Sequence, residues 1–402
     1  MDMDLAKLFE LDKLAKNEAR RFSRRRHLHE VIINAKGRTF TGIVGPRGAG
    51  KTVLLRQFAL AGADFFYLSL DTFPGADLFA LAKTLAEKYG VKTLLLDEIH
   101  FFRGYESALK RIFDFLDLRV IFTSSVALSL FESAQDLSRR VRLRYLYPFS
   151  FREYLYFRES VLTDPLKLGD IARGAWTPGH MKQAYLFDEY LQGGLLPFSL
   201  EEPAVLPALE NILEKIITRD IPGASGLRSD EIDSIRKLVR FAGRSAPEDI
   251  NYSTISRNIG VTKYKAEQYV RLLEKSFVLN PVPPAGTNVL REPKVLMCVP
   301  FRLLYRGYED AVGGLREDFV AQALKMRCGT IHYLKSTRGE KTPDFLVEEE
   351  GKEFVVEVGG KGKGRSQFKG YRAESKLILS HSSDDAGIKK PLFLLGFAPD
   401  PL

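Results

Sequence analysis

Residues 39–60 read TFTGIVGPRGAGKTVLLRQFAL, in which an apolar run, a glycine-rich loop and a helical pattern follow one another. Gly45, Gly48 and Gly50 allow the backbone to bend so that its N–H groups point inward around phosphate oxygens. Lys51 can then reach the outer phosphates of a nucleotide, and the Thr52 hydroxyl can ligate magnesium. The order of strand, loop and helix is the context that a phosphate-binding loop requires. The predicted nucleotide-binding residues of this loop are Gly45, Pro46, Arg47, Gly48, Ala49, Gly50, Lys51, Thr52 and Val53.

A second apolar run, VKTLLLDEIHFF at 91–102, contains two adjacent acids. Residues 93–96 predict a buried parallel strand, because they are apolar throughout rather than alternating. Asp97 and Glu98 follow at its carboxyl end, where open α/β sheets place their ligands. We expect Asp97 to hold Mg²⁺ through water and Glu98 to orient the attacking water. Acids at strand ends are often surface residues, but the phosphate loop upstream favours the functional interpretation.

Two further segments carry candidate site residues. The run RVIFTSS at 119–125 predicts the next strand, and its terminal hydroxyls include Ser124, a candidate sensor of the terminal phosphate. The segment LSRRVRLRYLYPFSFREYL at 137–155 places Arg139 and Arg140 just before a β-like run. An arginine that offsets charge on the transferred phosphoryl group is common in ATPases. The spacing leaves open which arginine serves, and whether it reaches its own site or that of a neighbouring subunit.

Together, the phosphate loop, the LLLDE strand end, the TSS strand end and the YPFSFREYL segment resemble a family of prokaryotic AAA+ ATPases. The C-terminal part of that family has winged-helix and nuclease-like portions, and the resemblance extends over nearly the whole chain. It implies an α/β fold with a three-layer ATPase core and a helical lid, ATP and Mg²⁺ as cofactors, and a homo-oligomer. Ser138-Arg139-Arg140 stands where many relatives have a glycine-arginine pair. The resemblance therefore favours Arg140 as the finger and keeps Arg139 as the alternative.

The length of 402 residues predicts several domains. We place a P-loop ATPase domain at 1–150, a helical lid and connector at 151–227, a winged helix-turn-helix at 228–292 and a nuclease-like domain at 293–402. The third of these rests on three amphipathic patterns with a turn at Gly260 and a wing-like run, FVLNPVPP, after them. On its third helix the residues expected to face outward are Lys263, Tyr264, Lys265, Gln268 and Arg271. Such residues suit phosphates and groove edges, but winged helices also serve as protein-protein modules.

A hairpin with two carboxylates is predicted at 343–361, PDFLVEEEGKEFVVEVGGK. Asp344 opens its first strand and Glu357 lies near the end of its second, and carboxylate oxygens of this kind hold divalent cations. The layout is similar to that of PD-(D/E)xK nucleases. The further site residues that this resemblance implies are Glu317 on an upstream helix and Gln367 and Tyr371 one helical turn apart downstream.

One position of this hairpin departs from the nuclease pattern. Gly359 stands where those nucleases have a lysine that offsets the charge of the attacking water. Lys361 lies on the same strand face, one pleat further along. We therefore expect a nuclease-like domain that is inactive, and migration of the lysine to Lys361 is the alternative.

The composition is that of a globular protein, with 45% hydrophobic residues, 28% charged residues and a net charge of +9. Basic clusters near both ends favour a polyanion, so double-stranded DNA is a predicted partner, although solvated helix faces carry such clusters as well. No apolar run approaches the roughly 20 residues of a membrane span. Cys298 and Cys328 provide no disulfide framework, which predicts a reducing, cytoplasmic setting.

The sequence thus predicts an α/β protein that binds ATP or ADP, hydrolyses ATP and associates with DNA. Lys51, Glu98 and Arg140 are the predicted catalytic residues, with Arg139 as the alternative to Arg140. Two other functions remain open at this point. One is a nucleotide-gated switch that acts through protein partners, and the other is an ATP-stimulated DNA nuclease.

Overall fold

The protein divides into two compact units in the computed structural model. The first comprises residues 1–148 with 223–225, and the second comprises residues 149–222 with 226–402. None of the described helices is long and apolar enough to cross a membrane. The described residues are 5–72, 77–125, 137, 139–286, 292–334, 342–359, 368, 375–382 and 385–399.

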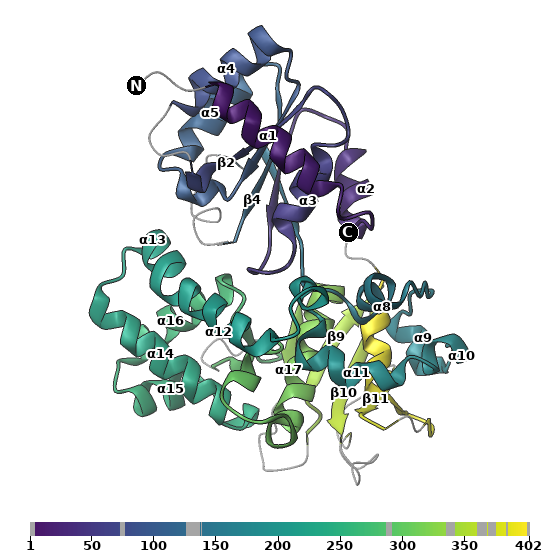
Figure 1. The fold of residues 1–402 in the computed structure, drawn as a ribbon. Helices are drawn as coiled ribbons and strands as arrows, with labels where there is room; N and C mark the ends of the chain where they lie inside the picture. Colours follow the sequence, from purple (N-terminus) through teal and green to yellow (C-terminus); the bar gives the residue numbers. More distant parts are fainter. Residues whose placement is uncertain are drawn as a thin grey trace. The chain divides into compact units, whose positions relative to one another are not determined.

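A five-stranded sheet forms the centre of the first unit (Figure 1). Its strand order is β2-β3-β4-β1-β5, and every neighbouring pair is parallel. β1 and β3 are buried at all five positions, as expected for strands that helices cover on both faces. The elements are α1 (Leu5–Ala19), α2 (His27–Ile33), β1 (Phe40–Val44), α3 (Lys51–Phe58), β2 (Phe65–Ser69), α4 (Leu78–Tyr89), β3 (Thr93–Asp97), α5 (Tyr105–Phe115), β4 (Arg119–Ser124) and β5 (Val141–Tyr145).

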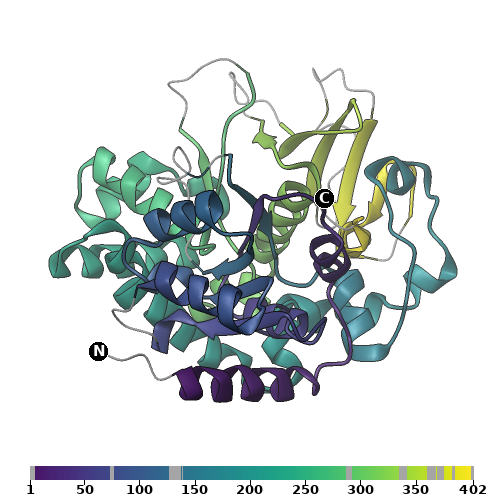
Figure 2. The same ribbon diagram turned by 90° about the horizontal axis from the view of Figure 1, so that it is seen from above.

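Helices cover both faces of this parallel sheet (Figure 2). Residues of α1, α2 and α3 share a hydrophobic core with strand residues such as Ile43 and Leu95. Side chains alternate along a strand, so Phe40 faces the opposite way, where its ring centroid lies 5.2 Å from that of Phe113 on α5. α4 packs against α5 on that side. The predicted three-layer α/β arrangement is confirmed for this unit.

The second unit contains further helices and two more sheets (Figure 1). One sheet has the order β12-β11-β10-β9-β8, with β10, β11 and β12 parallel and β8, β9 and β10 antiparallel; the other is the antiparallel pair β6-β7. The helices are α8 (Phe151–Glu159), α9 (Leu168–Arg173), α10 (Pro178–Met181), α11 (Phe187–Glu189), α12 (Val205–Lys215), α14 (Ser229–Arg244), α15 (Tyr252–Ile259), α16 (Lys263–Lys275) and α17 (Tyr308–Cys328), and α13 (Ile221–Ser225) is divided between the two units. The strands are β6 (Leu279–Val282), β7 (Lys294–Met297), β8 (Ile331–Tyr333), β9 (Phe345–Glu349), β10 (Lys352–Gly359), β11 (Ser375–Ser380) and β12 (Lys389–Pro391).

The segment expected to form the lid and connector begins with α8. Ser150 and Glu153 form a capping box at the N-terminus of this helix. Its aromatic residues pack on the C-terminal end of the chain. The ring of Phe151 lies 5.4 Å from that of Phe397 and 5.2 Å from that of Tyr190. Residues 149–222 belong to the second compact unit, whereas the family resemblance implies a lid on the ATPase core.

The three amphipathic helices that the sequence predicts after residue 228 are present as α14, α15 and α16. Asn251 and Thr262 cap the second and third helices, and Gly260 ends the second with a positive φ of 72°. Val270 and Leu273 of α16 are buried, as predicted. The strand β6 follows directly and pairs with β7, so helices and hairpin share one core.

Candidate functional site

The glycine-rich loop of the first unit joins β1 to α3. Gly48 and Gly50 have φ values of +82° and +85°, a conformation that residues with a Cβ rarely adopt. Gly45 has no room for a side chain, because a Cβ there would lie 2.1 Å from the carbonyl oxygen of Leu146. The geometry of the loop therefore requires glycine at each of these positions.

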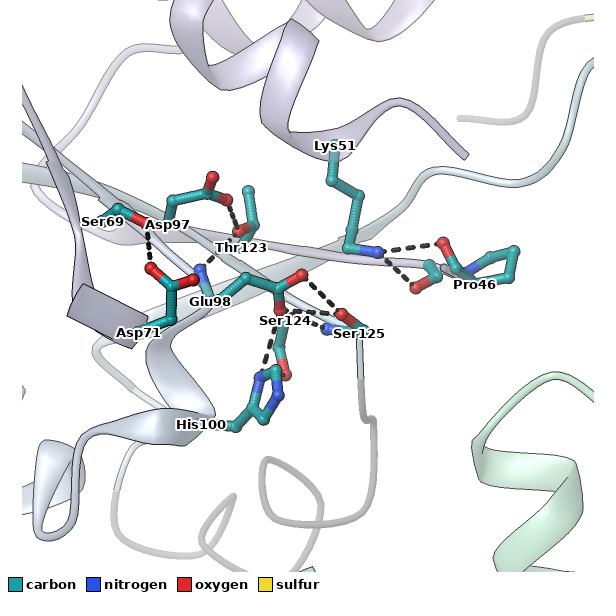
Figure 3. A network of polar contacts seen from close by, with 11 residues as sticks. Pro46, Lys51, Ser69, Asp71, Asp97, Glu98, His100, Thr123, Ser124 and Ser125 are labelled. Carbon is teal, nitrogen blue, oxygen red and sulfur yellow. Dashed lines mark hydrogen bonds and ion pairs between the residues drawn. The ribbon is translucent and has the colours of Figure 1, made fainter. Parts of the chain in front are cut away.

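Lys51 folds back over this loop (Figure 3). Its Nζ donates hydrogen bonds to the carbonyl oxygens of Gly45 at 2.8 Å and Pro46 at 2.9 Å, and the residue is only 5% exposed. The loop thus keeps a buried cation at the start of α3, next to the backbone N–H groups of the helix N-terminus. This is the charge that a phosphate-binding loop needs.

Asp97, the last residue of β3, is 2% exposed. Two hydroxyl groups donate hydrogen bonds to its carboxylate, namely those of Tyr67 at 2.8 Å and Thr123. Burial raises the pKa of Asp97, whereas the hydroxyls of Thr123, Tyr67 and Thr52 act to lower it. Thr52 belongs to the glycine-rich segment, so its effect on the pKa of Asp97 indicates that this segment lies close to the strand end. A hydroxyl and a carboxylate side by side are a donor set that fits Mg²⁺.

Glu98 has a left-handed backbone, with φ +53°. For a residue other than glycine such a conformation costs on the order of 1 kcal/mol and is common in active sites. Ser125 holds the Glu98 carboxylate, because its Oγ lies 2.7 Å from both oxygens and its N–H donates to Oε2 at 3.3 Å (Figure 3). His100 Nδ1 also lies 3.3 Å from Oε2. The strained backbone and these contacts fix the position of the Glu98 carboxylate at the end of β3.

The charge state of Glu98 follows from its neighbours. Burial acts to raise the pKa of Glu98, but the charges of Lys51 and His100, the Ser125 hydrogen bond and the charge of Arg47 lower it below its ordinary value. Glu98 is therefore ionised at neutral pH. An ionised carboxylate is what a group needs in order to accept a proton or a hydrogen bond from water.

The end of β4 supplies the contacts to both acids. The Thr123 hydroxyl donates to Asp97 and accepts from the Glu98 N–H at 2.9 Å. The predicted sensor, Ser124, lies next to it with its Oγ 3.3 Å from His100 Nδ1 (Figure 3). Sequence reasoning gave no role to His100 or Tyr67. Tyr67 lies on β2, which is the neighbour of β3. Its contact with Asp97 could therefore be predicted only if the strand order were known.

The two candidate finger arginines and the glycine-rich loop lie at opposite ends of the strands. The arginines precede β5, whose first residue pairs with the first residue of β1, whereas the loop follows the last residue of β1. A five-residue strand places its two ends about 13 Å apart. Arg140 Nη2 lies 3.0 Å from Asp114 Oδ1 on α5, and Arg139 is exposed. Both arginines thus belong to the end of the strands that is remote from the glycine-rich loop.

The comparisons with known proteins bear on this site. Residues 37–155 match the family model of an AAA domain. The match lies mostly in the first unit, and we refer to this part of the chain below as the AAA domain. Residues 185–298 match a domain of unknown function, DUF8612.

Similarities that extend over more of the chain exist as well. An uncharacterized protein of Methanocaldococcus jannaschii is 29% identical over 366 residues, which cover 81% of this chain and 77% of that protein. The Holliday junction branch migration motor RuvB of Thermotoga maritima shares 15% identity with a TM-score of 0.26, over 61% of this chain and 82% of its own. PCH-2 of C. elegans shares 16% identity with a TM-score of 0.28, over 64% of this chain and 67% of its own.

The second unit has a cavity of about 630 Å³ where the sequence predicts a metal site. Glu317 of α17 and Asp344, just before β9, both line it, together with Lys294 of β7. Glu357 is 2% exposed on β10, where the next two residues line the cavity. The other predicted residues of this site, Lys361, Gln367 and Tyr371, lie outside the described part of the chain.

Two carboxylates of this cavity are bonded to protein groups. Asp344 Oδ2 accepts a hydrogen bond of 2.7 Å from the Val358 N–H, and Glu317 forms an ion pair with Lys294. Within the described ranges, no group of three or more His, Cys, Asp or Glu side chains is placed to hold a metal ion. Lys294 was missed from the sequence, because nothing local marks a lysine at the start of a strand as a partner of a glutamate on a distant helix.

The predicted nucleic-acid face of α16 is partly neutralised. Lys263 pairs with Glu292 and Lys265 with Glu231, each at 2.6 Å. Arg271 pairs with an acid of its own helix, and Tyr264 is 67% exposed. Arg271 is exposed and can exchange its partner for a phosphate at small cost, whereas Lys263 and Lys265 pair with acids whose side chains are only 19% and 11% exposed.

Proposed function

We propose that the AAA domain binds ATP with Mg²⁺ and hydrolyses it. The observation that carries this proposal is the register of the sheet: Val44, the last residue before the glycine-rich loop, pairs with Ser124 at the end of β4, and the next residue, Ser125, holds Glu98. It brings the phosphate-binding loop together with the two acids that the sequence placed on a different strand. A loop alone supports binding, and the adjacent, ionised Glu98 adds the group that a water nucleophile requires.

In this mechanism the loop N–H groups and Lys51 bind the outer phosphates. Lys51 exchanges its two carbonyl acceptors for phosphate oxygens, which carry a full charge and form stronger hydrogen bonds. Thr52 and, through water, Asp97 would hold Mg²⁺, whose charge offsets that of the phosphates. Glu98 orients the attacking water, and Ser124 stands at the neighbouring strand end to contact the terminal phosphate.

An arginine from a neighbouring copy completes the site in this proposal. Arg139 and Arg140 lie at the end of the strands that is remote from the loop, which supports action on the site of another subunit in a homo-oligomer. Arg140 must leave Asp114 to do so, whereas Arg139 is exposed and needs no such step. An arginine finger contributes roughly 10³-fold or more to the rate in related chemistry.

The second unit is proposed to contact DNA and not to cut it. The order of α14, α15, α16 and the β6-β7 hairpin supports a winged helix, and α17 against the mixed sheet supports a nuclease-like fold. The bonded state of Glu317 and Asp344 supports an inactive nuclease-like domain over an ATP-stimulated nuclease. The two free cysteines fit the predicted cytoplasmic setting.

The hold of Ser125 on both oxygens of Glu98 favours a second candidate function. ATP hydrolysis would be slow while the neighbouring hydroxyl holds the carboxylate, and a partner would have to release it. The AAA domain would then act as a nucleotide-gated switch through a protein partner.

Steady-state ATP turnover with Mg²⁺, with and without duplex DNA, tests the proposal. Glu98→Gln is expected to lower the turnover rate at least about 100-fold with ATP affinity retained, and Lys51→Ala to weaken binding itself. Glu87→Gln is the matched control, because Glu87 lies 60% exposed on α4 of the same unit. Turnover that is unchanged in Glu98→Gln refutes the hydrolytic site. Turnover that is absent in the parent but restored by Ser125→Ala supports the switch.

A further inference from the structure

Lys294 has unusual surroundings for a lysine. Its side chain is 14% exposed at the first position of β7, and its Nζ forms an ion pair with Glu317, whose side chain is 12% exposed. The ammonium also lies 6.0 Å from the centre of the Phe345 ring, at the start of β9. The side chain therefore ends between α17 and the mixed sheet, inside the cavity of the second unit.

Three carboxylates act on this ammonium. Burial lowers the pKa of Lys294, but the charges of Glu317, Asp344 and Glu248 bring it above its ordinary value. All three acids line the same cavity. The Lys294 ammonium thus faces three acids that come from three separate segments of the chain, and Arg302, Arg306 and Arg316 line the same cavity.

A divalent cation does not fit the groups as they stand. The family resemblance implies that Asp344 and Glu317 help to hold one, but Glu317 is bonded to the ammonium and Asp344 to a backbone N–H. Mg²⁺ and Mn²⁺ require carboxylate oxygens that are available to the metal. The position among the acids where a metal would be held is occupied by a positive charge of the protein itself.

We propose that the Lys294 ammonium takes the place of a divalent metal ion in the second unit, so that this cavity excludes Mg²⁺ and Mn²⁺. The acids are then neutralised without a metal, and no metal-activated water is available to cut a phosphodiester bond. The inference rests on the nuclease-like reading of the second unit and is independent of ATP hydrolysis in the AAA domain.

The proposal makes a definite statement about Lys294→Met. Methionine retains an apolar stem against Phe345 but removes the charge. Glu317 then loses its ion-pair partner in a cavity of about 630 Å³ that Asp344 and Glu248 also line. Because like charges at close range favour an added cation, the variant should acquire a metal site that the parent lacks.

Binding of Mn²⁺ to the full chain, followed by electron paramagnetic resonance of free Mn²⁺, tests this statement. All proteins carry Asp97→Ala and are free of nucleotide, which removes the metal ligand of the AAA domain. The parent and Lys294→Arg are expected to bind no Mn²⁺, whereas Lys294→Met binds a single ion. Adding Asp344→Asn to Lys294→Met should weaken that binding at least about tenfold. Lys237→Met, at an exposed position of α14, is the control and should resemble the parent.

Two results would overturn the proposal. One is a Mn²⁺ site in the parent that Asp344→Asn removes, since Lys294 would then stand beside a metal and not in its place. The other is a Lys294→Met chain with a native circular dichroism spectrum that binds no Mn²⁺. Lys294→Gln repeats the test if the methionine variant does not fold. None of these outcomes depends on ATP turnover, so the two proposals fail separately.

Discussion

The buried ion pair between Arg302 and Asp318 permits a quantitative test of the second unit. Both side chains are at most 1% exposed. Arg302 donates from Nε at 2.6 Å and from Nη2 at 3.0 Å to the two Asp318 oxygens, and its Nη1 reaches the carbonyl oxygens of Ala242 and Ser245 at the end of α14. Asp318 also accepts the Met297 N–H at 3.0 Å. One guanidinium thus joins α14 to α17, and its carboxylate partner joins α17 to β7.

Arg302→Met would leave the Asp318 carboxyl buried without its partner. Removing one member of a buried pair costs roughly 3–5 kcal/mol of unfolding free energy. For a unit of this size each kcal/mol lowers Tm by about 2–4 °C, so the second unit should lose on the order of 6–20 °C. Differential scanning calorimetry of the full chain measures this shift, and the transition of the AAA domain serves as an internal reference.

A matched variant separates this effect from a general loss of charge. Arg236→Met breaks an exposed pair with Glu214, whose side chains are 41% and 48% exposed, and should cost under about 1 kcal/mol. Arg302→Met/Asp318→Leu removes both buried charges and should recover part of the loss. The reasoning is refuted if Arg302→Met lowers Tm no more than Arg236→Met does.

Two further predictions concern the AAA domain and the long helix of the second unit. The pKa of Glu98 lies below its ordinary value, so Glu98 should stay ionised, and ATP turnover should persist, until the pH falls below the usual glutamate range. His100→Gln removes one charge that lowers this pKa. The variant should therefore move the acid limb of the kcat/KM profile to higher pH. An acid limb that does not move would contradict this assignment. Gly45→Ala should abolish binding of a fluorescent ADP analogue, because its Cβ would meet a carbonyl oxygen at 2.1 Å, whereas Gly313→Ala on α17 meets nothing within 4 Å and should leave binding intact. Equal binding by both alanine variants would show that the loop tolerates a side chain.

Local patterns explain which parts of the fold the sequence could predict. The glycine-rich loop needs particular backbone angles within a few residues, and the strand before Asp97 is apolar at consecutive positions. The first of the three amphipathic patterns predicted after residue 228 is present as α14, because its amphipathic period is long and unbroken. Features that depend on short-range sequence were therefore accessible.

Contacts between distant segments were not accessible in the same way. Tyr67 reaches Asp97 only because β2 is the neighbour of β3, and Lys294 reaches Glu317 only because β7 lies beside α17. The arginine favoured by the resemblance, Arg140, is bonded to Asp114, a residue that no local pattern connects to it. Pairings of this kind are decided by strand order and helix packing, which one sequence does not reveal.

The position of Lys51 has a consequence for the thermodynamics of nucleotide capture. With 5% exposure and two carbonyl acceptors, its ammonium is already largely stripped of water before ATP arrives. The dehydration of this charge is thus part of the free energy of folding and not of binding. A phosphate that replaces the carbonyls recovers the attraction without a second dehydration of the lysine. Nucleotide should therefore stabilise the AAA domain against unfolding by more than it would if Lys51 were fully hydrated before binding.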